Sequence, residues 1–184
     1  MTTPFEETAI ARRYEPLREL GSGGMGTVYL VADRFRGGEQ VALKTIHPER
    51  LRHLDKFRQE FTVLSKLRHP HLLRVIDFGS TPAPEERFFF TSEYVAGQRL
   101  DTWAAGKGLV PLLQVLTQLT EVLHHLHARN VLHLDIKPDN LLVTGGNGEP
   151  VSSRLIDLGL ARFRQQQDQE TSGTVHFMSP EQIT

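Results

Sequence analysis

The sequence contains no cysteine, which excludes disulfide bonds, thiolate metal sites and cysteine nucleophiles. It also lacks a long apolar run, since no stretch approaches the roughly 20 apolar residues that a membrane-spanning helix needs. The polar N-terminus has no apolar segment of the kind found in signal peptides. We therefore expect no membrane segment in this chain and a cytoplasmic location.

A surplus of charge of either sign is also missing. The chain has 21 Lys and Arg against 22 Asp and Glu, a formal net charge of -1 at pH 7. No basic field would attract nucleic acid, so we expect no nucleic-acid partner. With 39% hydrophobic and 23% charged residues, the composition is typical of a globular protein with a sizeable core.

The first half of the sequence has the pattern of short strands with one helix. Residues 1–13 are polar and are expected to form a flexible lead-in. Short apolar runs between Leu17 and Ile46 predict strands, and Leu72–Phe78 and Arg87–Val95 are further strand candidates. Residues 55–67 carry apolar side chains at helical spacing and predict a helix.

The second half of the sequence is dominated by one helix. Its apolar positions from Pro111 to His127 cover a broad arc, so this helix is expected to need neighbours on more than one side. Two apolar runs follow, Leu141–Val143 and Leu155–Ile156, and the turn-rich segment Thr144–Ser153 is expected to join them as a hairpin loop.

This order of elements predicts an α+β fold with two lobes. Residues 14–96 would form a small β-rich lobe with one helix. Residues 97–184 would form part of a mainly helical lobe that carries the hairpin. A hinge is expected near Glu93–Gly97.

A glycine-rich segment lies between the first two predicted strands. Residues Gly21-Ser22-Gly23-Gly24-Met25-Gly26-Thr27-Val28 fit the spacing G-x-G-x-x-G-x-V. Such loops often serve only as turns. However, a dinucleotide-binding loop is followed by a helix, whereas strand-like residues follow here. The segment therefore fits a flap between two strands, whose backbone N–H groups can approach phosphates closely.

Lys44 ends the apolar run Val41–Lys44. A lysine at a strand end commonly extends into solvent, and the alternative is a cation that binds the α- and β-phosphates of a nucleotide. Such a lysine needs an acid to hold it. Glu60, on the same side of the predicted helix as Phe57 and Leu64, is the natural candidate.

The most informative stretch is the loop from His133 to Asn140. Asp135 can orient a substrate hydroxyl and accept its proton, and Lys137 can neutralise a phosphoryl group in transfer. Asn140 offers an amide oxygen to Mg²⁺, and Asp157 follows the hairpin with a second oxygen ligand. A loop that groups these side chains between apolar runs is hard to explain by structure alone.

The histidines of the long helix have a simpler explanation. His124, His125 and His127 lie near its C-terminus, where polar or cationic side chains suit the helix dipole. We expect them to serve that role rather than to bind a metal.

Taken together and in this order, these motifs resemble the signature set of protein kinases. The resemblance extends from Tyr14 to Glu181, and Gly23–Gly26 with Met178–Gln182 are similar to bacterial Ser/Thr kinases. It implies ATP and Mg²⁺ as cofactors and a protein substrate with a Ser or Thr acceptor. It assigns catalysis to Asp135, Lys137, Lys44 and Glu60, and metal binding to Asn140 and Asp157. It implies that the nucleotide contacts Leu20, Gly21, Ser22, Gly23, Gly24, Met25, Gly26, Val28, Ala42, Lys44, Glu93, Val95, Leu142 and Ile156.

The sequence departs from the family pattern in several places. Leu134 replaces the arginine of His-Arg-Asp, the metal-binding tripeptide at Asp157 is Asp-Leu-Gly, and Ser179 replaces an alanine. We expect Thr174 to contact Asp135 and Lys137, as the family equivalent does. The family also implies later C-terminal helices, which these 184 residues do not contain.

Two other functions compete with an active protein kinase. A pseudokinase that binds nucleotide as a scaffold is disfavoured because the catalytic set around Asp135 is complete. A small-molecule kinase of the aminoglycoside phosphotransferase type shares the fold and also lacks the arginine. Lys137 and the segment Gly173–Glu181 favour a protein substrate over a small molecule.

Overall fold

A computed structural model describes residues 12–23, 26–46, 62, 65–80, 88–146, 148–157, 162–163 and 174–178. The chain divides into two compact units. The first unit comprises residues 1–67 and 74–94, and the second comprises residues 68–73 and 95–184. The segment 68–73, which precedes the fourth strand in sequence, therefore belongs to the second unit.

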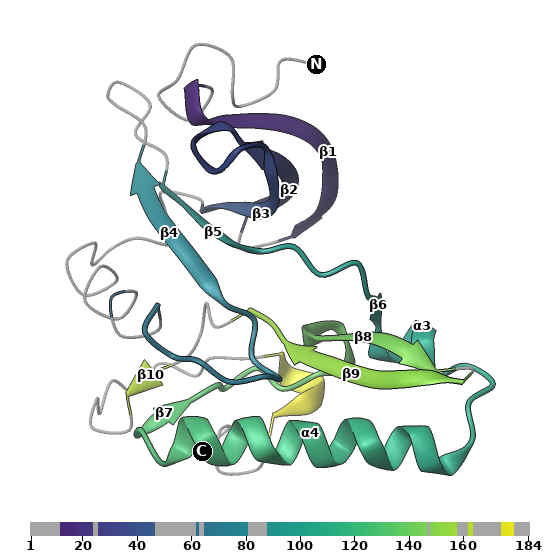
Figure 1. Ribbon diagram of the computed structural model, residues 1–184. Coiled ribbons are helices and arrows are strands. Elements are labelled where there is room, and N and C mark those ends of the chain that lie inside the picture. Colours follow the sequence, from purple (N-terminus) through teal and green to yellow (C-terminus); the bar gives the residue numbers. More distant parts are fainter. Residues whose placement is uncertain are drawn as a thin grey trace. The chain divides into compact units, whose positions relative to one another are not determined.

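The first unit contains a five-stranded antiparallel sheet with the order β1-β2-β3-β5-β4. Its curved strands β1 to β3 are visible in Figure 1. A short 3-10 turn, η1, connects β2 to β3. The strands are β1 (Tyr14–Gly23), β2 (Gly26–Asp33), β3 (Glu39–Ile46), β4 (Val75–Ser80) and β5 (Phe88–Glu93), and η1 spans Arg34–Arg36.

The core of this unit is a cluster of aromatic and aliphatic side chains from four strands. Tyr14 of β1 meets Phe89 of β5 edge to face, with ring centroids 5.9 Å apart. Val31, Val41 and Leu43 of β2 and β3 are fully buried beside them. Burial of such side chains is worth ~1.5–3 kcal/mol each, which explains why alternating apolar residues in these strands face one side.

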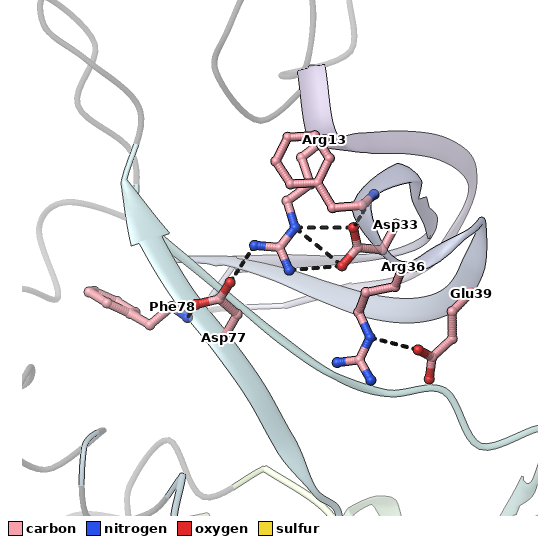
Figure 2. Close-up of polar contacts among 7 residues, drawn as sticks. Arg13, Asp33, Arg36, Glu39, Asp77 and Phe78 are labelled. Atoms are coloured by element: carbon pink, nitrogen blue, oxygen red, sulfur yellow. Dashed lines mark hydrogen bonds and ion pairs between the residues drawn. The ribbon is translucent and has the colours of Figure 1, made fainter.

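Arg13 fixes the start of β1 against two other strands. Its guanidinium donates to both oxygens of Asp33, at 2.9 to 3.2 Å, and forms a second ion pair with Asp77 on β4. Figure 2 shows the arginine between the two carboxylates. Asp33 also accepts a hydrogen bond from the backbone N–H of Phe35 and thereby caps the N-terminus of η1. Arg13 lies at the end of the predicted lead-in, and residues 1–11 lie outside the described part.

The second unit combines a small sheet with a long helix. Strand β6 (Gln98–Arg99) and helix α3 (Leu100–Ala104) precede helix α4 (Leu109–His127). The three-stranded sheet has the order β6-β8-β9 and is antiparallel, with α4 running alongside β9 in Figure 1. The remaining elements are β7 (Val131–Leu132), η3 (Pro138–Asn140), β8 (Leu141–Gly146), β9 (Glu149–Leu155), β10 (Arg162–Phe163), which pairs with β7, and η5 (Val175–Phe177).

Helix α4 has an apolar surface on more than one side, as its sequence pattern predicts. Val115, Val122 and Leu126 are completely buried. Other apolar residues of the same helix are largely exposed among the described residues, namely Leu109, Val110, Leu113 and Leu116. Among the described residues, no helix is long and apolar enough to cross a membrane.

Two predicted boundaries are wrong, whereas the long helix lies close to its predicted range of about Pro111 to His127. The hairpin loop is much shorter than Thr144–Ser153, because the ladder of β8 and β9 continues to the pair Gly146 and Glu149. Strand β4 begins at Val75 rather than Leu72, which instead forms an isolated parallel bridge with Leu155. Helix α4 begins at Leu109, two residues before Pro111, which fits proline in the first turn. The predicted helix 55–67 lies largely outside the described residues.

Candidate active site

The loop between β7 and β8 brings three of the predicted catalytic side chains together. Asp135 and Asn140 are buried, with 5% and 4% of their surface exposed, whereas Lys137 is half-buried. The 3-10 turn η3 closes this loop, and the backbone N–H of Asn140 donates to the carbonyl of Lys137 at 3.0 Å. Because η3 is followed directly by β8, the sheet β6-β8-β9 fixes the position of the end of this loop.

The carboxylate of Asp135 is the centre of the hydrogen-bond network. Lys137 Nζ lies 2.8 Å from Oδ2, and Asn140 Nδ2 donates to the same oxygen at 2.9 Å. Oδ1 accepts from both the backbone N–H and the hydroxyl of Thr174, at 3.0 and 2.7 Å. Lys137 also donates to the Thr174 hydroxyl at 2.7 Å. The predicted contact of Thr174 with Asp135 and Lys137 is confirmed.

This network determines the charge of Asp135. Burial by itself would raise the pKa of the carboxyl group, since a buried charge is poorly solvated. Hydrogen bonds from Lys137, Thr174 and Asn140 outweigh burial and hold the pKa of Asp135 below its ordinary value. Asp135 is therefore an ionised acceptor at neutral pH, in a fixed orientation.

His133 connects this loop to the end of β9. Burial lowers the pKa of His133, so its ring is neutral. Its Nε2 lies 3.0 Å from the carbonyl oxygen of Ile156, which can only accept, so the proton is on Nε2. Nδ1 then accepts from the backbone N–H of Asp135 at 3.4 Å. One neutral histidine therefore joins the backbones on either side of the site.

Asp157 comes directly after Ile156 in the sequence and therefore lies next to this connection. The backbone N–H of Ile156 donates to the carbonyl of Asn140 at 2.9 Å. Asp157 has φ 62, in the left-handed region that aspartate tolerates better than most residues. Leu158 and Gly159 of the Asp-Leu-Gly tripeptide lie outside the described residues.

The donor set fits a hard divalent cation that is shared with phosphates. Both amide hydrogens of Asn140 point at Asp135, one to its backbone oxygen at 2.8 Å and one to Oδ2. The Oδ1 atom of Asn140 is thereby left as the group that can bind a cation, and Asp157 supplies a carboxylate. The described residues contain no group of three or more His, Cys, Asp and Glu side chains that could hold a metal by themselves. A metal here would need further oxygen ligands, such as those of water or a nucleotide.

In the first unit, the glycines of the glycine-rich segment have two different physical roles. A side chain at Gly21 or Gly23 would meet nothing within 4 Å, so the strand is open at these positions. Gly26 is buried, has φ 138, and a Cβ there would lie 1.7 Å from the carbonyl oxygen of Thr45. Gly26 is thus required by the close approach of β3. Gly24 and Met25 lie outside the described residues.

Lys44 occupies the middle of the sheet. It pairs with Val28 on one side and Phe90 on the other, and its Nζ lies 5.9 Å from the centroid of the Phe90 ring. The side chain is half-buried and does not simply extend into solvent as lysines at strand ends commonly do. Glu60 lies outside the described residues, so the Lys44–Glu60 ion pair stays a prediction.

The sequence that forms these elements can be compared with known proteins. A family model described as protein kinase domain matches residues 14–184. The chain belongs to the protein kinase domain family. It is 33% identical to serine/threonine-protein kinase pkn2 of Myxococcus xanthus over 92% of this chain, and 36% identical to the DNA damage-responsive serine/threonine-protein kinase RqkA of Deinococcus radiodurans over 95%. Serine/threonine-protein kinase PrkC of Bacillus subtilis is 30% identical over 94%. The chain spans 21–27% of the length of these relatives.

The residues predicted to contact the nucleotide fall on both units of the kinase domain. Those in the first unit lie on neighbouring strands, with Ala42 of β3 paired with Leu30 of β2 and Ser92 of β5. The first unit holds Leu20, Gly21, Ser22, Gly23, Gly26, Val28, Ala42, Lys44 and Glu93, and the second holds Val95, Leu142 and Ile156. Their assembly around one nucleotide stays a prediction.

Two features of the kinase domain were not predicted from the sequence. Leu134 has φ 63, a left-handed conformation that costs a bulky residue about 1–2 kcal/mol, and no turn residue signals it. His69, His71 and His125 form a cluster in the second unit. The only sequence signal was the density of histidines in residues 69–71 and 124–127.

Proposed function

We propose that the protein is an ATP-dependent kinase that transfers the γ-phosphate to Ser or Thr hydroxyls of protein substrates, with Mg²⁺ as the metal. The observation that carries this proposal is the ionised carboxylate of Asp135, which is held by an ion pair with Lys137 and by hydrogen bonds from Asn140 and Thr174. In the transfer, the acceptor oxygen forms a bond to the γ-phosphorus while the bond from that phosphorus to the oxygen of ADP breaks. Asp135 orients the hydroxyl and takes its proton.

The neighbouring side chains supply the electrostatic part of the mechanism. Lys137, held beside Asp135 at 2.8 Å, neutralises charge on the phosphoryl group in transfer. Asn140 and Asp157 would hold Mg²⁺ through oxygen atoms, and the ion would neutralise the phosphates that the protein binds. Catalysis of this kind is mostly positioning and electrostatic stabilisation, so the buried hydrogen bonds of the loop matter for the rate.

The first unit would bind the phosphates. Gly21 and Gly23 leave the strand open, which lets backbone N–H groups approach an anion. Lys44, in the middle of the sheet, would contact the α- and β-phosphates with Glu60 as its partner. These assignments rest on the motif spacing and on the open positions in β1.

A protein acceptor is favoured over a small molecule. Thr174 belongs to the segment that was predicted to receive substrate, and it contacts both Asp135 and Lys137. The relatives are named serine/threonine-protein kinases. A pseudokinase is disfavoured because Asp135, Lys137 and Asn140 form a connected network. The cytoplasmic location and the absence of a nucleic-acid partner stay predictions.

The decisive experiment uses radiolabelled ATP with a protein acceptor and, in parallel, aminoglycosides. We expect label on Ser and Thr of the protein only. Asp135→Asn should lower kcat by about 10²–10⁴-fold, the usual contribution of a general base, while the KM for ATP changes little. Asp139→Asn is the matched control, because Asp139 is on the same loop but forms an exposed pair with Arg99. Label on aminoglycosides alone, or full activity of Asp135→Asn, would contradict the proposal.

A further inference from the structure

Strand β9 lies at the edge of its sheet, yet its outer edge is hydrogen-bonded along most of its length. Gln118 of α4 donates to the carbonyl of Val151 at 2.9 Å and accepts from the backbone N–H of Ser153 at 2.7 Å. Further along, the backbone N–H of Leu155 donates to the carbonyl of His71, and that of Leu73 donates to the carbonyl of Leu155, at 2.8 and 2.9 Å. An exposed strand edge would otherwise leave these groups to water or to another chain.

The hydrogen-bonded edge of β9 ends at Leu155, two residues before Asp157, the proposed metal ligand. Leu155 is followed by Ile156, whose N–H and carbonyl bond to Asn140 and His133, and then by Asp157. The segment 71–73 is therefore the last contact on the outer edge of β9 before the active site. Whatever holds this segment in place also helps to position Asp157.

Three histidines hold segment 71–73 against α4 and β9. The ring of His69 lies 4.9 Å from that of His125 on α4 and 5.6 Å from that of His71, measured between centroids. His71 Nδ1 lies 3.1 Å from the carbonyl of Ser153, and its Nε2 lies 3.6 Å from a carboxylate oxygen of Glu121 on α4. We call His69, His71 and His125 the histidine cluster.

The hydrogen bonds require two of these rings to be neutral. His69 Nδ1 accepts from the backbone N–H of His71 at 3.2 Å, so this nitrogen carries no proton. His125 Nδ1 lies 3.3 Å from Nη1 of Arg129, which can only donate. The Nε2 atom of His125 is buried without a hydrogen-bond partner in the described structure. Protonation of either ring would place the new proton on the nitrogen that now accepts.

The charges around the cluster also oppose a positive charge on His69 or His125. Arg129 follows α4, and Arg154 on β9 donates to the same Ser153 carbonyl as His71 does, whereas Glu121 is the one carboxylate that faces the cluster among the described residues. Burial lowers the pKa of His69, with His71 and Arg129 acting in the same direction and Glu121 against it. Burial is also the main cause that lowers the pKa of His125, and the charges of Arg129 and His69 act in the same direction.

We propose that the histidine cluster is a proton-sensitive positioning element, which holds segment 71–73 on β9 while His69 and His125 are neutral and releases it when they are protonated. The direction follows from linkage. A histidine whose pKa is lower in the folded state contributes its full stability above the unfolded value of about 6.5, and loses it as the pH falls from there towards the folded value. The effect on catalysis, through Asp157, rests on the proposed function.

Hydrogen exchange of three backbone amides tests the proposal directly. Leu73 and Leu155 donate in the ladder between segment 71–73 and β9, and Ile156 reports on the backbone next to Asp157. After correction for intrinsic rates, we expect their protection in the wild type to fall by about tenfold or more between pH 7.5 and about pH 5.5, one pKa unit of differential protonation being tenfold. The amide of Val41, in the first unit, serves as the reference.

Two variants and a control separate protonation from simple packing. His125→Phe keeps an aromatic ring beside His69 but cannot be protonated, and His69→Asn keeps a side-chain acceptor for the N–H of His71. Each should reduce the pH dependence of the three amides by at least threefold. His127→Gln changes an exposed histidine of the same helix and should leave it unchanged. Equal pH dependence in all variants, or no fall in the wild type, would overturn the proposal.

The pH profile of phosphoryl transfer then tests the link to catalysis. We expect kcat at saturating ATP to fall below about pH 6.5 in the wild type and to be flatter in His125→Phe. If the protein transfers no phosphate at any pH while the amides behave as expected, the proposed function fails and the histidine cluster stands. If transfer is normal and the kcat profiles of wild type and His125→Phe coincide, the link to Asp157 is wrong.

Discussion

Removal of Arg13 should destabilise the first unit, because it leaves the buried carboxylate of Asp33 without its main partner. Asp33 has 1% of its side chain exposed, and Arg13 supplies three of the four hydrogen bonds that its carboxylate accepts. Arg13→Met removes the guanidinium that lies over the rings of Tyr14 and Phe35, and among the described residues the Asp33 carboxylate then keeps only the N–H of Phe35 as a hydrogen-bond partner. Arg13 lies one residue before the family match begins, so a chain trimmed to residue 14 would carry the same defect.

The expected loss of stability follows from the different burial of Arg13 and Asp33. Breaking a buried ion pair by removing one partner typically costs ~3–5 kcal/mol, because the other charge is left uncompensated. Arg13 itself keeps 26% of its side chain exposed, so we expect the low end, about 3 kcal/mol. Asp77 is 41% exposed, and Asp77→Asn should cost no more than about 1 kcal/mol. A loss of about 3 kcal/mol is large against the ~5–15 kcal/mol that stabilises a whole domain.

The assay must report on the first unit alone. The chain has one tryptophan, Trp103, which is buried in the second unit, so its fluorescence serves as an internal control. Urea-dependent hydrogen exchange of amides in β2 and β3 reports on the first unit. We expect Arg13→Met to lower the opening free energy of these amides, while the Trp103 transition moves less.

The pH dependence provides an independent check of the mechanism. Burial would raise the pKa of Asp33, but the hydrogen bonds from Arg13 and from the Phe35 N–H, together with the charges of Arg13 and Arg36, outweigh it and the pKa is lowered. The pair therefore stabilises the fold above the unfolded pKa of about 3.9 and loses this contribution as the pH falls below it. The difference between wild type and Arg13→Met should shrink below about pH 4. A cost under 1 kcal/mol at neutral pH, or a difference independent of pH, would refute the reasoning.

Three further predictions concern single residues. Gly26→Ala should cost at least ~3 kcal/mol in urea unfolding, because its Cβ would overlap the Thr45 carbonyl, whereas Gly23→Ala, with open space around it, should change stability by less than about 1 kcal/mol. Leu134→Gly should be as stable as Leu134→Ala or more stable, reversing the usual order, since φ is 63 at this position; a deficit of ~1 kcal/mol for glycine would contradict this. Thr174→Val removes two hydrogen bonds to charged groups and should lower kcat by about tenfold or more, with the KM for ATP unchanged, in steady-state assays.

The catalytic loop could be predicted from sequence because its chemistry is local. Asp135, Lys137 and Asn140 are within six residues, and a loop that short between two strands leaves few ways to separate them. The contact to Thr174 spans 39 residues of sequence and came from the family resemblance, not from spacing. Strands of the first unit could also be predicted, since short apolar runs mark β2 and β3, and Val31, Val41 and Leu43 of these runs are buried in one core.

Element boundaries were harder to predict for a physical reason. Gly145 and Gly146, both with positive φ, look like loop residues, yet they continue the ladder of β8 through an irregular register. A Cβ at Gly145 would lie 1.9 Å from the carbonyl oxygen of Pro150, so this glycine permits close strand approach rather than a loop. A glycine signals that a backbone needs space or a positive φ, but it does not say which.

The histidines show what sequence reasoning leaves out. Near the C-terminus of α4, His125 satisfies the dipole argument as well as His124 does, and nothing in the sequence distinguishes them. The fold places His125 against His69, 56 residues earlier in the chain, and buries its Nε2 without a partner. His125 is half-buried beside Arg129, and burial together with this charge lowers its pKa. The contact with His69 and the burial of Nε2 come from the tertiary fold, which is why His125→Phe, but not His127→Gln, is expected to change the pH dependence of the backbone amides.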